Sequence, residues 1–517
     1  MKRVHVVTTG AILVLVLVSV STAAQQRGSL SQRSYNDARR ILDKGIQALG
    51  GVEKFTLVED ISIKYDTKAF ELGQSANPEA PLEVRREEGI RVIDLRQKRS
   101  YRELKTKYRG GTLNWTKQVL NDKSGFTIDL VANVAYPIAA PSVPGNARGV
   151  QRWLPHLLIQ TALARVGTLR LLGNGQHQGH SEHVITFADV VGSQIALYFD
   201  AQSDLLTKYE VLGDDPLMGD VLTEVFFSDY RDVNGLKVPF KTIAKYGGKI
   251  LWDQTFIEVK INTRPADELF EVTKEATKGQ ETYVALSPTL TKLAPDVYFV
   301  NGISAGDIWF YSQMFVVFKD YVLVVESPLN ENISQAIITK IKEVAPDKPI
   351  RYLVPTHYHF DHLGGVRAYI AKGATILTTP GNRNSIEKIA ATAHTIRPDS
   401  LSLNPRKVSI ETFTDRKTIT DGQQTVELYN LGPTPHVDEI VIVYLPREKI
   451  LFVSDLMMTR ITGPFTPVSV TDLDFAQKLR QLDLKVETVA NGHGWIGKLH
   501  DFLKFLAQDN NRVNKGQ

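Results

Sequence analysis

The chain has 517 residues, of which 43% are hydrophobic and 23% charged, and its formal net charge is +4 at pH 7. This length exceeds one ordinary domain, so two globular domains are expected, and the balanced charge gives no reason to expect nucleic acid as a partner. The sequence contains no cysteine. Disulfides, thiolate metal ligands and a cysteine nucleophile are therefore excluded.

The N-terminal segment, residues 1–24, has the pattern of a signal peptide. Lys2 and Arg3 precede an apolar core at residues 11–20, and residues 22–24 (Thr-Ala-Ala) offer small side chains for cleavage. The apolar core is short for a membrane span, although a retained anchor stays open as an alternative. We expect a periplasmic or secreted protein that keeps no stable membrane span after cleavage.

Residues 30–272 are expected to form a first domain that is rich in strands. Apolar residues at helical spacing predict a helix over 33–49, which Gly50 and Gly51 end. From about residue 57 to 270, short stretches of alternating polarity are separated by Asp, Asn and Gly. This pattern predicts an antiparallel sheet with one buried face. Residues 154–172 interrupt it with a more helical segment.

Three phrases in this first domain resemble the periplasmic lipoprotein-carrier and lipoprotein-sorting family. They are residues 48–51 (Ala-Leu-Gly-Gly), 198–206 (Tyr-Phe-Asp-Ala-Gln-Ser-Asp-Leu-Leu) and 227–239 (Phe-Ser-Asp-Tyr-Arg-Asp-Val-Asn-Gly-Leu-Lys-Val-Pro). The resemblance implies an antiparallel half-barrel that is covered by helices and encloses an apolar cavity. That cavity would hold a lipid or long acyl chain, but we favour a structural or substrate-shaping role for the domain.

Three histidines of the first domain, His177, His180 and His183, invite interpretation as a metal site. Residues spaced by three along this stretch do not form a shared helix face, because Gly173, Gly175 and Gly179 mark it as a loop. We predict a solvated hairpin turn here and no metal.

A second domain is expected at residues 289–510, joined to the first by a linker at 273–288. The linker begins with a charged stretch that contains a glycine and has no apolar period. Strands and helices alternate after it. The predicted strands are 297–300, 314–318, 321–325, 350–354, 440–445 and 450–454, and the predicted helices are 332–343, 364–371 and 382–393.

The densest group of imidazole and carboxylate side chains lies at residues 357–362, which read His-Tyr-His-Phe-Asp-His. Imidazole and carboxylate groups at this density favour a divalent transition metal, above all zinc. In an extended turn, His357 and His359 point the same way and can bind one ion. Asp361 and His362 then begin the next helix, where they can bind a second ion.

Three further candidates follow at strand ends or in loops: His436, Asp455 and His493. The complete ordered set resembles the metallo-β-lactamase superfamily, whose pattern is His-x-His-x-Asp-His, then His, Asp and His. The resemblance covers roughly residues 290–505 and implies an αβ/βα sandwich, so the whole chain is expected to be a two-domain α+β protein. Glu326 stands where the family often has Asp, in a position that normally supports the metal loop.

The resemblance also implies a role for each ligand and two zinc ions per chain. The first ion would be held by His357, His359 and His436, and the second by Asp361, His362 and His493, with Asp455 bridging both. A metal-bound hydroxide would cleave an ester, thioester, lactone or amide bond. Asp361 would also orient the hydroxide, which makes it the candidate catalytic residue.

Asp455 narrows the class within the resemblance. The antibiotic-hydrolysing β-lactamases carry Cys or Ser at that place, whereas a bridging Asp is typical of thioesterases, lactonases and phosphodiesterases. Three alternatives stay open: a true β-lactamase, a lipid-binding protein with a vestigial metal domain, and an iron protein with redox chemistry. The expected partner is a small-molecule substrate, with lipid-like molecules among the candidates, and the sequence sets no oligomeric state.

Overall fold

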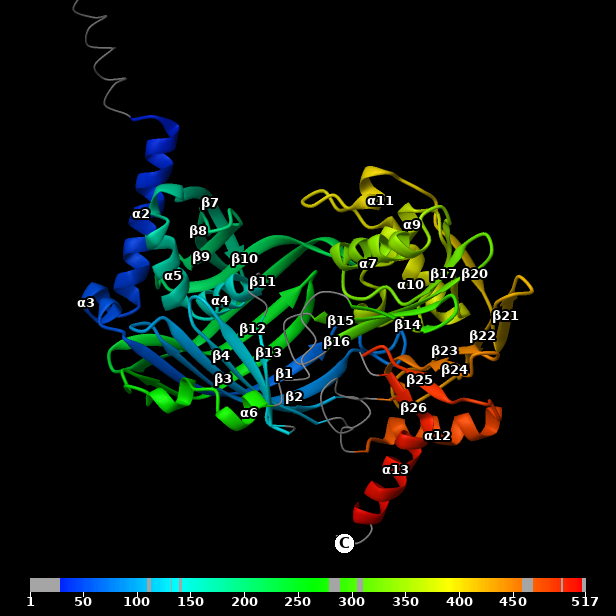
Figure 1. Cartoon of the computed structure of the whole chain (residues 1–517). Coiled ribbons are helices and arrows are strands. Elements are labelled where there is room, and N and C mark those ends of the chain that lie inside the picture. The colour runs from blue at the N-terminus through cyan, green and yellow to red at the C-terminus, as the bar shows by residue number, and fades with distance from the viewer. Residues whose placement is uncertain are drawn as a thin grey trace, which may run out of the picture. The chain divides into compact units, whose positions relative to one another are not determined.

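The computed structural model describes residues 28–108, 113–131, 133–138, 142–278, 289–304, 310–457, 468–493 and 496–513 (Figure 1). The predicted signal peptide and most of the predicted linker lie outside these residues. The chain divides into two compact units that interleave along the sequence. The first consists of Met1–Leu57, Gln151–Leu212 and Glu224–Thr242, and the second of Val58–Val150, Gly213–Thr223 and Ile243–Gln517. The domain boundaries predicted at 272 and 289 stay a prediction.

Most of the N-terminal half is strand, as predicted. In the described residues, thirteen strands are hydrogen-bonded in the order β6-β5-β4-β3-β2-β1-β13-β12-β11-β10-β9-β8-β7. The strands are β1 (Asp60–Glu71), β2 (Glu83–Asp94), β3 (Arg99–Lys107), β4 (Leu113–Leu120), β5 (Gly125–Asp129), β6 (Val134–Pro137), β7 (Arg170–His177), β8 (His180–Ala188), β9 (Gln194–Asp200), β10 (Leu206–Asp215), β11 (Gly219–Val233), β12 (Leu236–Tyr246) and β13 (Lys249–Ile261). Neighbours such as β1 and β2 pair antiparallel. The closure of this sheet into a half-barrel stays a prediction.

The first helix begins where the sequence provides a cap. Ser29 and Gln32 form a capping box at the start of α2 (Leu30–Ala48), a contact that stabilises a helix by about 1 kcal/mol. The predicted face is buried, with Ala38 and Leu42 fully covered. The helix ends just before Gly50, which has a φ of 132°. Only glycine fits at this position, because a β-carbon there would lie 2.2 Å from the Gly235 carbonyl oxygen.

The remaining short elements of the N-terminal half confirm two predictions. The helices are α3 (Gly51–Thr56), α4 (Val143–Gln151) and α5 (Pro155–Ala164), with 3₁₀ turns at Val166–Thr168 and Asp267–Phe270 and a short α6 (Lys274–Lys278). The segment 154–172 is thus largely helical. The three histidines lie on a hairpin between β7 and β8, which turns at Gln178 and Gly179 with positive φ. Across the described residues, no helix has the length and apolarity that a membrane crossing requires.

The part of the second unit that follows residue 289 contains two further sheets. Within the described residues, one has seven strands in sequence order, β14 to β20, and the other has six, β21 to β26. The strands are β14 (Thr289–Ala294), β15 (Val297–Ser304), β16 (Phe310–Val317), β17 (Val322–Val325), β18 (Ile350–Val354), β19 (Thr375–Thr378), β20 (Ser409–Thr412), β21 (Arg416–Thr420), β22 (Thr425–Asn430), β23 (Val441–Leu445), β24 (Ile450–Phe452), β25 (Thr488–Ala490) and β26 (Ile496–Lys498). The helices are α7 (Glu331–Val344), α8 (Phe360–Leu363), α9 (Val366–Ala371), α10 (Pro380–Ala391), α11 (Ser400–Leu403), α12 (Val470–Leu482) and α13 (Leu499–Val513).

These two sheets pack face to face, with helices outside, as the alternation of their residues requires. In β17, Leu323 and Val325 belong to the apolar cluster between the sheets, while Val324 belongs to a second cluster with helix residues. Strand β23 divides in the same way, with Val443 inside and Ile442 outside. Both faces are buried, which explains the continuous apolar runs in the sequence. Figure 1 shows the layers, with α7, α9 and α10 over one sheet and α12 and α13 over the other.

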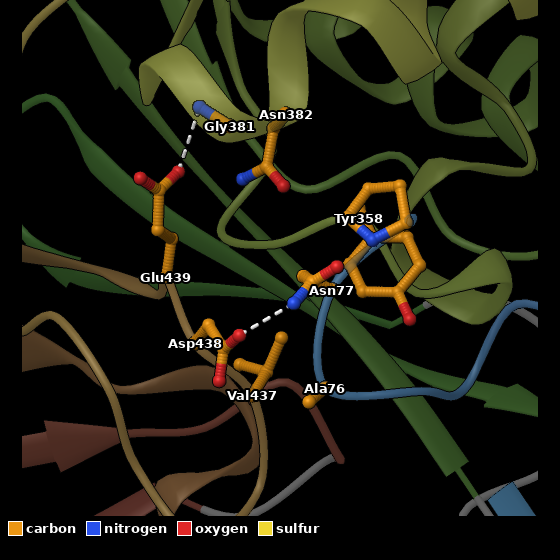
Figure 2. A pocket seen from close by; sticks show the side chains of 9 residues that line it. Ala76, Asn77, Tyr358, Gly381, Asn382, Val437, Asp438 and Glu439 are labelled. Carbon is orange, nitrogen blue, oxygen red and sulfur yellow. Dashed lines mark hydrogen bonds between the residues drawn. The ribbon is translucent and has the colours of Figure 1, made fainter. Parts of the chain in front are cut away.

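Loops of the second unit enclose a pocket of about 230 Å³ (Figure 2). Its walls come from four separate segments of the chain, one of them the start of α10: Ala76, Asn77, Pro78, Tyr358, Gly381, Asn382, Val437, Asp438 and Glu439. The side chain of Asn77 donates to Asp438 at 2.6 Å, and the Gly381 N–H donates to Glu439 at 2.9 Å. Hydrogen bonds therefore hold the loops together around the cavity.

Candidate metal centre

The predicted site residues lie in the segments that connect strands to the next element of the two sheets. Strand β18 leads into the turn with His357 and His359, and Asp361 and His362 lie on α8. His436 precedes β23, Asp455 lies on the 3₁₀ turn Ser454–Leu456 after β24, and His493 follows β25. Strand ends bring these loops to one edge of the two sheets, because strands β17, β18 and β24, β25 run parallel within their sheets.

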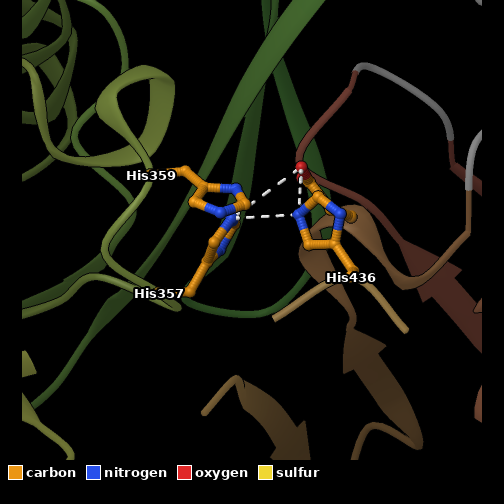
Figure 3. Close-up of side chains that lie close together, drawn as sticks. His357, His359 and His436 are labelled. Atoms are coloured by element: carbon orange, nitrogen blue, oxygen red, sulfur yellow. Dashed lines mark hydrogen bonds and ion pairs between the residues drawn. The ribbon is translucent and has the colours of Figure 1, made fainter. Parts of the chain in front are cut away.

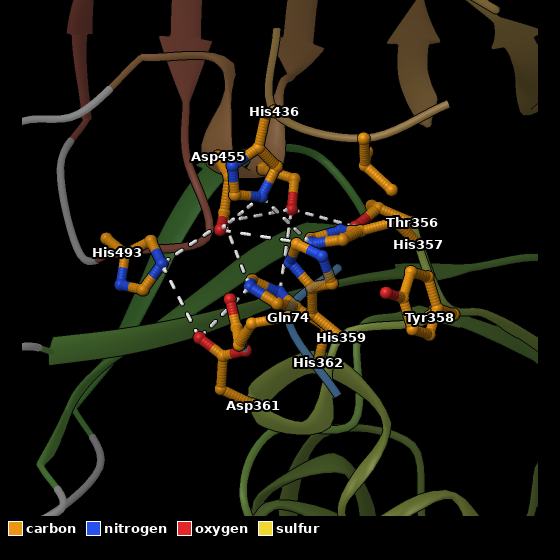
Figure 4. A network of polar contacts seen from close by, with 12 residues as sticks. Gln74, Thr356, His357, Tyr358, His359, Asp361, His362, His436, Asp455 and His493 are labelled. Carbon is orange, nitrogen blue, oxygen red and sulfur yellow. Dashed lines mark hydrogen bonds and ion pairs between the residues drawn. The ribbon is translucent and has the colours of Figure 1, made fainter. Parts of the chain in front are cut away.

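The structure brings all seven predicted residues together in two groups. In each group, the candidate ligand atoms lie within 4.8 Å of one another (Figures 3 and 4). We call them the histidine group (His357, His359, His436 and Asp455) and the mixed group (Asp361, His362, His493 and Asp455). Asp455 belongs to both, and apart from the half-buried His436 every member is buried.

The carboxylate of Asp455 divides its two oxygens between the groups. Its Oδ2 lies 3.2 Å from His436 Nε2 and 3.9 Å from His357 Nε2. Its Oδ1 lies 2.9 Å from His362 Nε2 and 3.1 Å from His493 Nε2. One oxygen facing each group is the arrangement that a bridging ligand needs.

Ring nitrogens of two members of the histidine group, His357 and His436, face one another. His357 Nδ1 contacts the hydroxyl of Thr356 at 3.0 Å, and its Nε2 lies 3.3 Å from Nε2 of His436. The Nδ1 atom of His359 is buried and has no hydrogen-bond partner in the structure. A buried unpaired lone pair is costly unless a cation or donor meets it. The donor set of imidazole nitrogen and carboxylate oxygen therefore fits a divalent metal such as zinc.

Two rings of the histidine group, His357 and His359, have a lowered pKa and stay neutral. Burial, together with the nearby His362 and His359, lowers the pKa of His357 well below its ordinary value. Burial and the neighbouring His436 lower the pKa of His359 to about 3. Neutral imidazoles have a lone pair available for a metal at any pH near neutrality.

The mixed group holds charge. Burial opposes protonation of His362, but the carboxylates of Asp455 and Glu326 outweigh it and raise its pKa well above the ordinary value. His493 also has a raised pKa, because Asp455 outweighs the effect of burial. Burial raises the pKa of Asp361, yet the neighbouring His362 outweighs it and lowers that pKa to about 2. The members of this group form ion pairs with one another, at 2.9 Å between His362 and Asp455 and 3.1 Å between His493 and Asp455.

Glu326 contacts the candidate ligand His362 and two residues next to other candidate ligands, which agrees with the supporting role that the resemblance implies. Its Oε1 accepts hydrogen bonds from Thr356 at 2.5 Å and from Ser454 at 2.9 Å, and it lies 3.2 Å from His362 Nδ1. The backbone at Glu326 and Ser454 has positive φ, 76° and 51°, which is strained for residues other than glycine and is found around functional sites.

Sequence reasoning did not find four residues that support the ligands. Thr356 and Ser454 each directly precede a predicted ligand, so their position next to the motif was an available signal. Gln74 and Ser75 contact Asp361 and His359 from the connection between β1 and β2. No local pattern marks those two residues, which lie more than 280 positions away from the ligands that they contact.

Comparison with known proteins agrees with the fold of this part of the chain. Residues 309–493 match the family model of the metallo-β-lactamase superfamily. These residues form a metallo-β-lactamase superfamily domain, and members of that superfamily are generally metal-dependent hydrolases. No curated protein matches the chain. The resemblance of the N-terminal half to lipoprotein carriers stays a prediction.

Two solved structures are similar to a part of the chain. One is a metallo-β-lactamase from Pontibacter korlensis, with 22% sequence identity and a TM-score of 0.34, over 44% of this chain and 100% of that one. The other is the DIM-1 metallo-β-lactamase, with 16% identity and a TM-score of 0.33, over 44% of this chain and 98% of that one.

Proposed function

We propose that this protein is an exported dinuclear zinc hydrolase that cleaves an ester, thioester, lactone or amide bond of a small molecule. The single observation that carries the proposal is the position of Asp455, whose two oxygens face two separate groups of buried ligands. An isolated structural ion would need only one such group. Two groups that share a carboxylate are typical of two-metal hydrolytic sites.

The chain's own residues would do three things in this reaction. The five imidazoles and two carboxylates would bind the two zinc ions, and their burial keeps bulk water from competing with them for the metal. When bound, a pair of zinc ions lowers the pKa of a water toward neutrality and polarises the bond to be cleaved. Asp361, ionised because its pKa is lowered to about 2, accepts a hydrogen bond from the attacking water and orients it.

The substrate would enter beside the ligands. The pocket of Figure 2 is lined by Tyr358, which lies between two ligands in the sequence, and by Val437, which follows His436. Its volume of about 230 Å³ is small for a whole drug-sized ligand and suits one end of a small substrate. The presence of Asp455 where antibiotic-hydrolysing enzymes have Cys or Ser supports an ester, thioester or lactone over a β-lactam.

Export is proposed on the sequence alone. Residues 1–24 combine a basic start, an apolar core and small residues before the expected cleavage site. We expect the mature protein in the periplasm or outside the cell.

The test combines metal analysis with a small hydrolysis panel on purified mature protein. We expect two zinc ions per chain and turnover of a thioester, a lactone or a generic ester, with nitrocefin and a phosphodiester as the competing classes. Turnover of nitrocefin alone would identify a β-lactamase. Metal-free protein that binds lipid and hydrolyses no panel member, even after zinc is supplied, would contradict the proposal and favour the binding-protein alternative. Coloured protein with bound iron would point to redox chemistry instead.

A further inference from the structure

The connection between β1 and β2 enters the metal centre, although it lies outside the segment that matches the superfamily model. It belongs to the same compact unit as the ligands. Every residue from Gly73 to Asn77 makes a hydrogen bond with the loops that carry ligands. These bonds are Phe360 N to Gly73 O at 3.3 Å, Gln74 Nε2 to Asp361 Oδ1 at 2.7 Å, His359 Nε2 to Ser75 O at 3.0 Å, Asp438 N to Ala76 O at 2.7 Å and Asn77 Nδ2 to Asp438 Oδ2 at 2.6 Å.

Gln74 selects which oxygen of Asp361 is available (Figure 4). Its side-chain amide donates to Oδ1 at 2.7 Å. The other oxygen, Oδ2, lies 3.5 Å from His362 Nε2 and 4.0 Å from His493 Nε2, among the ligand atoms of the mixed group. The amide therefore fixes the rotation of a carboxylate that would otherwise turn freely between two equivalent orientations.

Ser75 selects the tautomer of His359. Its backbone oxygen also accepts from the Tyr358 hydroxyl at 2.5 Å. A carbonyl oxygen only accepts hydrogen bonds, so His359 Nε2 must carry the hydrogen. The lone pair then resides on Nδ1, the buried atom that has no hydrogen-bond partner, and is available to a metal bound by the histidine group, to which His359 belongs.

The conformation of the connection fits this position closely. Gly73 has a φ of 70°, and a β-carbon there would lie 3.4 Å from Cβ of Phe360, next to the ligand Asp361. Ser75 is 4% exposed, and its hydroxyl donates to the Pro81 carbonyl at 3.0 Å, which ties the connection to itself. These contacts hold Gln74 and Ser75 in place independently of a substrate.

We propose that residues 73–77 are a built-in outer part of the metal centre, in which the Gln74 amide positions Asp361 and the Ser75 carbonyl positions His359. Outer contacts of this kind typically change metal affinity or activity about 10- to 100-fold when removed. The proposal rests on the proposed metal centre and adds a contribution from the N-terminal half of the chain. Gln74 is a positioning residue, because it acts on the ligand Asp361.

The experiment is a zinc titration of full-length mature protein against a competing chelator, with Gln74→Met as the variant. Methionine has a similar length and no donor. We expect one of the two equivalents to bind about 10-fold more weakly and the other to stay within about twofold of wild type. With cobalt as the probe, the visible spectrum of the weakened site should also change, because Asp361 can rotate.

Two controls separate this role from a general loss of structure. Glu79→Gln alters an exposed residue of the same connection, whose ion pair with Lys388 is 3.7 Å long, and should leave both equivalents unchanged. Gln74→Ala removes the same amide donor without adding an apolar side chain and should have the same effect as Gln74→Met. If the methionine variant misfolds, the alanine variant still measures the loss of the amide. Equal weakening of both equivalents in step with a lower Tm would assign Gln74 a structural role only.

Failure of this inference is distinct from failure of the proposed function. Wild-type protein that binds two zinc ions, beside folded Gln74 variants that bind both with wild-type affinity and spectrum, would overturn the positioning role and leave the metal centre intact. Wild-type protein that binds no zinc would overturn the metal centre, and the positioning role with it.

Discussion

The histidine group and the mixed group share Asp455 but differ in the pKa values of their imidazoles. Burial and neighbouring imidazoles lower the pKa of His357 and His359, so these rings are already neutral. In the mixed group, carboxylates raise the pKa of His362 and His493, so protons compete with a metal for these rings up to a higher pH. The difference teaches that one shared carboxylate can serve two sites of opposite electrostatic character, because each of its oxygens faces only one of them.

The largest effect is expected at Asp455, because this residue belongs to both groups. Asp455→Ala removes a ligand oxygen from both groups, so both metal equivalents should be lost or weakened together. Loss of several kcal/mol of transition-state stabilisation corresponds to a fall in kcat/KM of roughly 1000-fold or more. Elemental analysis and steady-state kinetics measure the two quantities. Retention of one tightly bound zinc would show that the groups do not depend equally on Asp455.

A change confined to the histidine group should separate the two sites. His357→Ala is expected to lose about one metal equivalent and nearly all activity, because both ions are needed for the reaction. The sheet formed by residues 30–270 should stay folded, since none of its strands contains His357. Elemental analysis, kinetics and circular dichroism test this together. Full activity with one metal would contradict the two-metal mechanism.

Replacing Glu326, which contacts the mixed group at His362, by glutamine should reduce zinc affinity or activity less than the two alanine variants do. Glu326→Gln keeps the shape of a side chain that contacts Thr356, Ser454 and His362 but removes its charge. We expect about a 10- to 100-fold loss of affinity or activity, concentrated in the zinc equivalent that His362 helps to bind. Glu331→Gln is the matched control, because the Glu331 carboxylate accepts hydrogen bonds from Gln335 and Ser400, which are not candidate ligands. Equal loss at both equivalents would argue that Glu326 supports the loops as a whole.

The last prediction concerns pH and reports the electrostatic difference between the two groups directly. Zinc must compete with protons at His362 and His493, so affinity at the mixed group should fall by about tenfold per pH unit for each proton released as pH decreases. Zinc binding to His357 and His359 should change little, because their pKa values are lowered. Calorimetry in buffers of different ionisation enthalpy counts the released protons. In the metal-free protein, the raised pKa values stabilise the fold fully below the unfolded pKa of about 6.5, and this stabilisation is lost as pH rises through the folded pKa. Zinc uptake without proton release would contradict the contrast between the groups.

The sequence by itself determined which residues are candidate ligands and which elements carry them. Residue type and order were sufficient for the seven candidates, because imidazole and carboxylate at these spacings have few other uses. Periodicity was sufficient for α2, for strands such as β17 and β23, and for the β7–β8 hairpin, because each depends on neighbours a few residues away. A supporting role for Glu326 was also expected, because the resemblance to the superfamily implies a carboxylate that supports the metal loop at this position.

Only the tertiary structure decided how those ligands are oriented. The division of the Asp455 oxygens depends on how two sheets pack, and the contacts of Gln74 and Ser75 join residues 287 and 284 positions apart. Their side chains are ordinary for a loop, so no local pattern distinguishes them from any other polar turn. Packing of distant segments sets such contacts, and for that reason the ligands could be predicted from the sequence while the groups that position them could not.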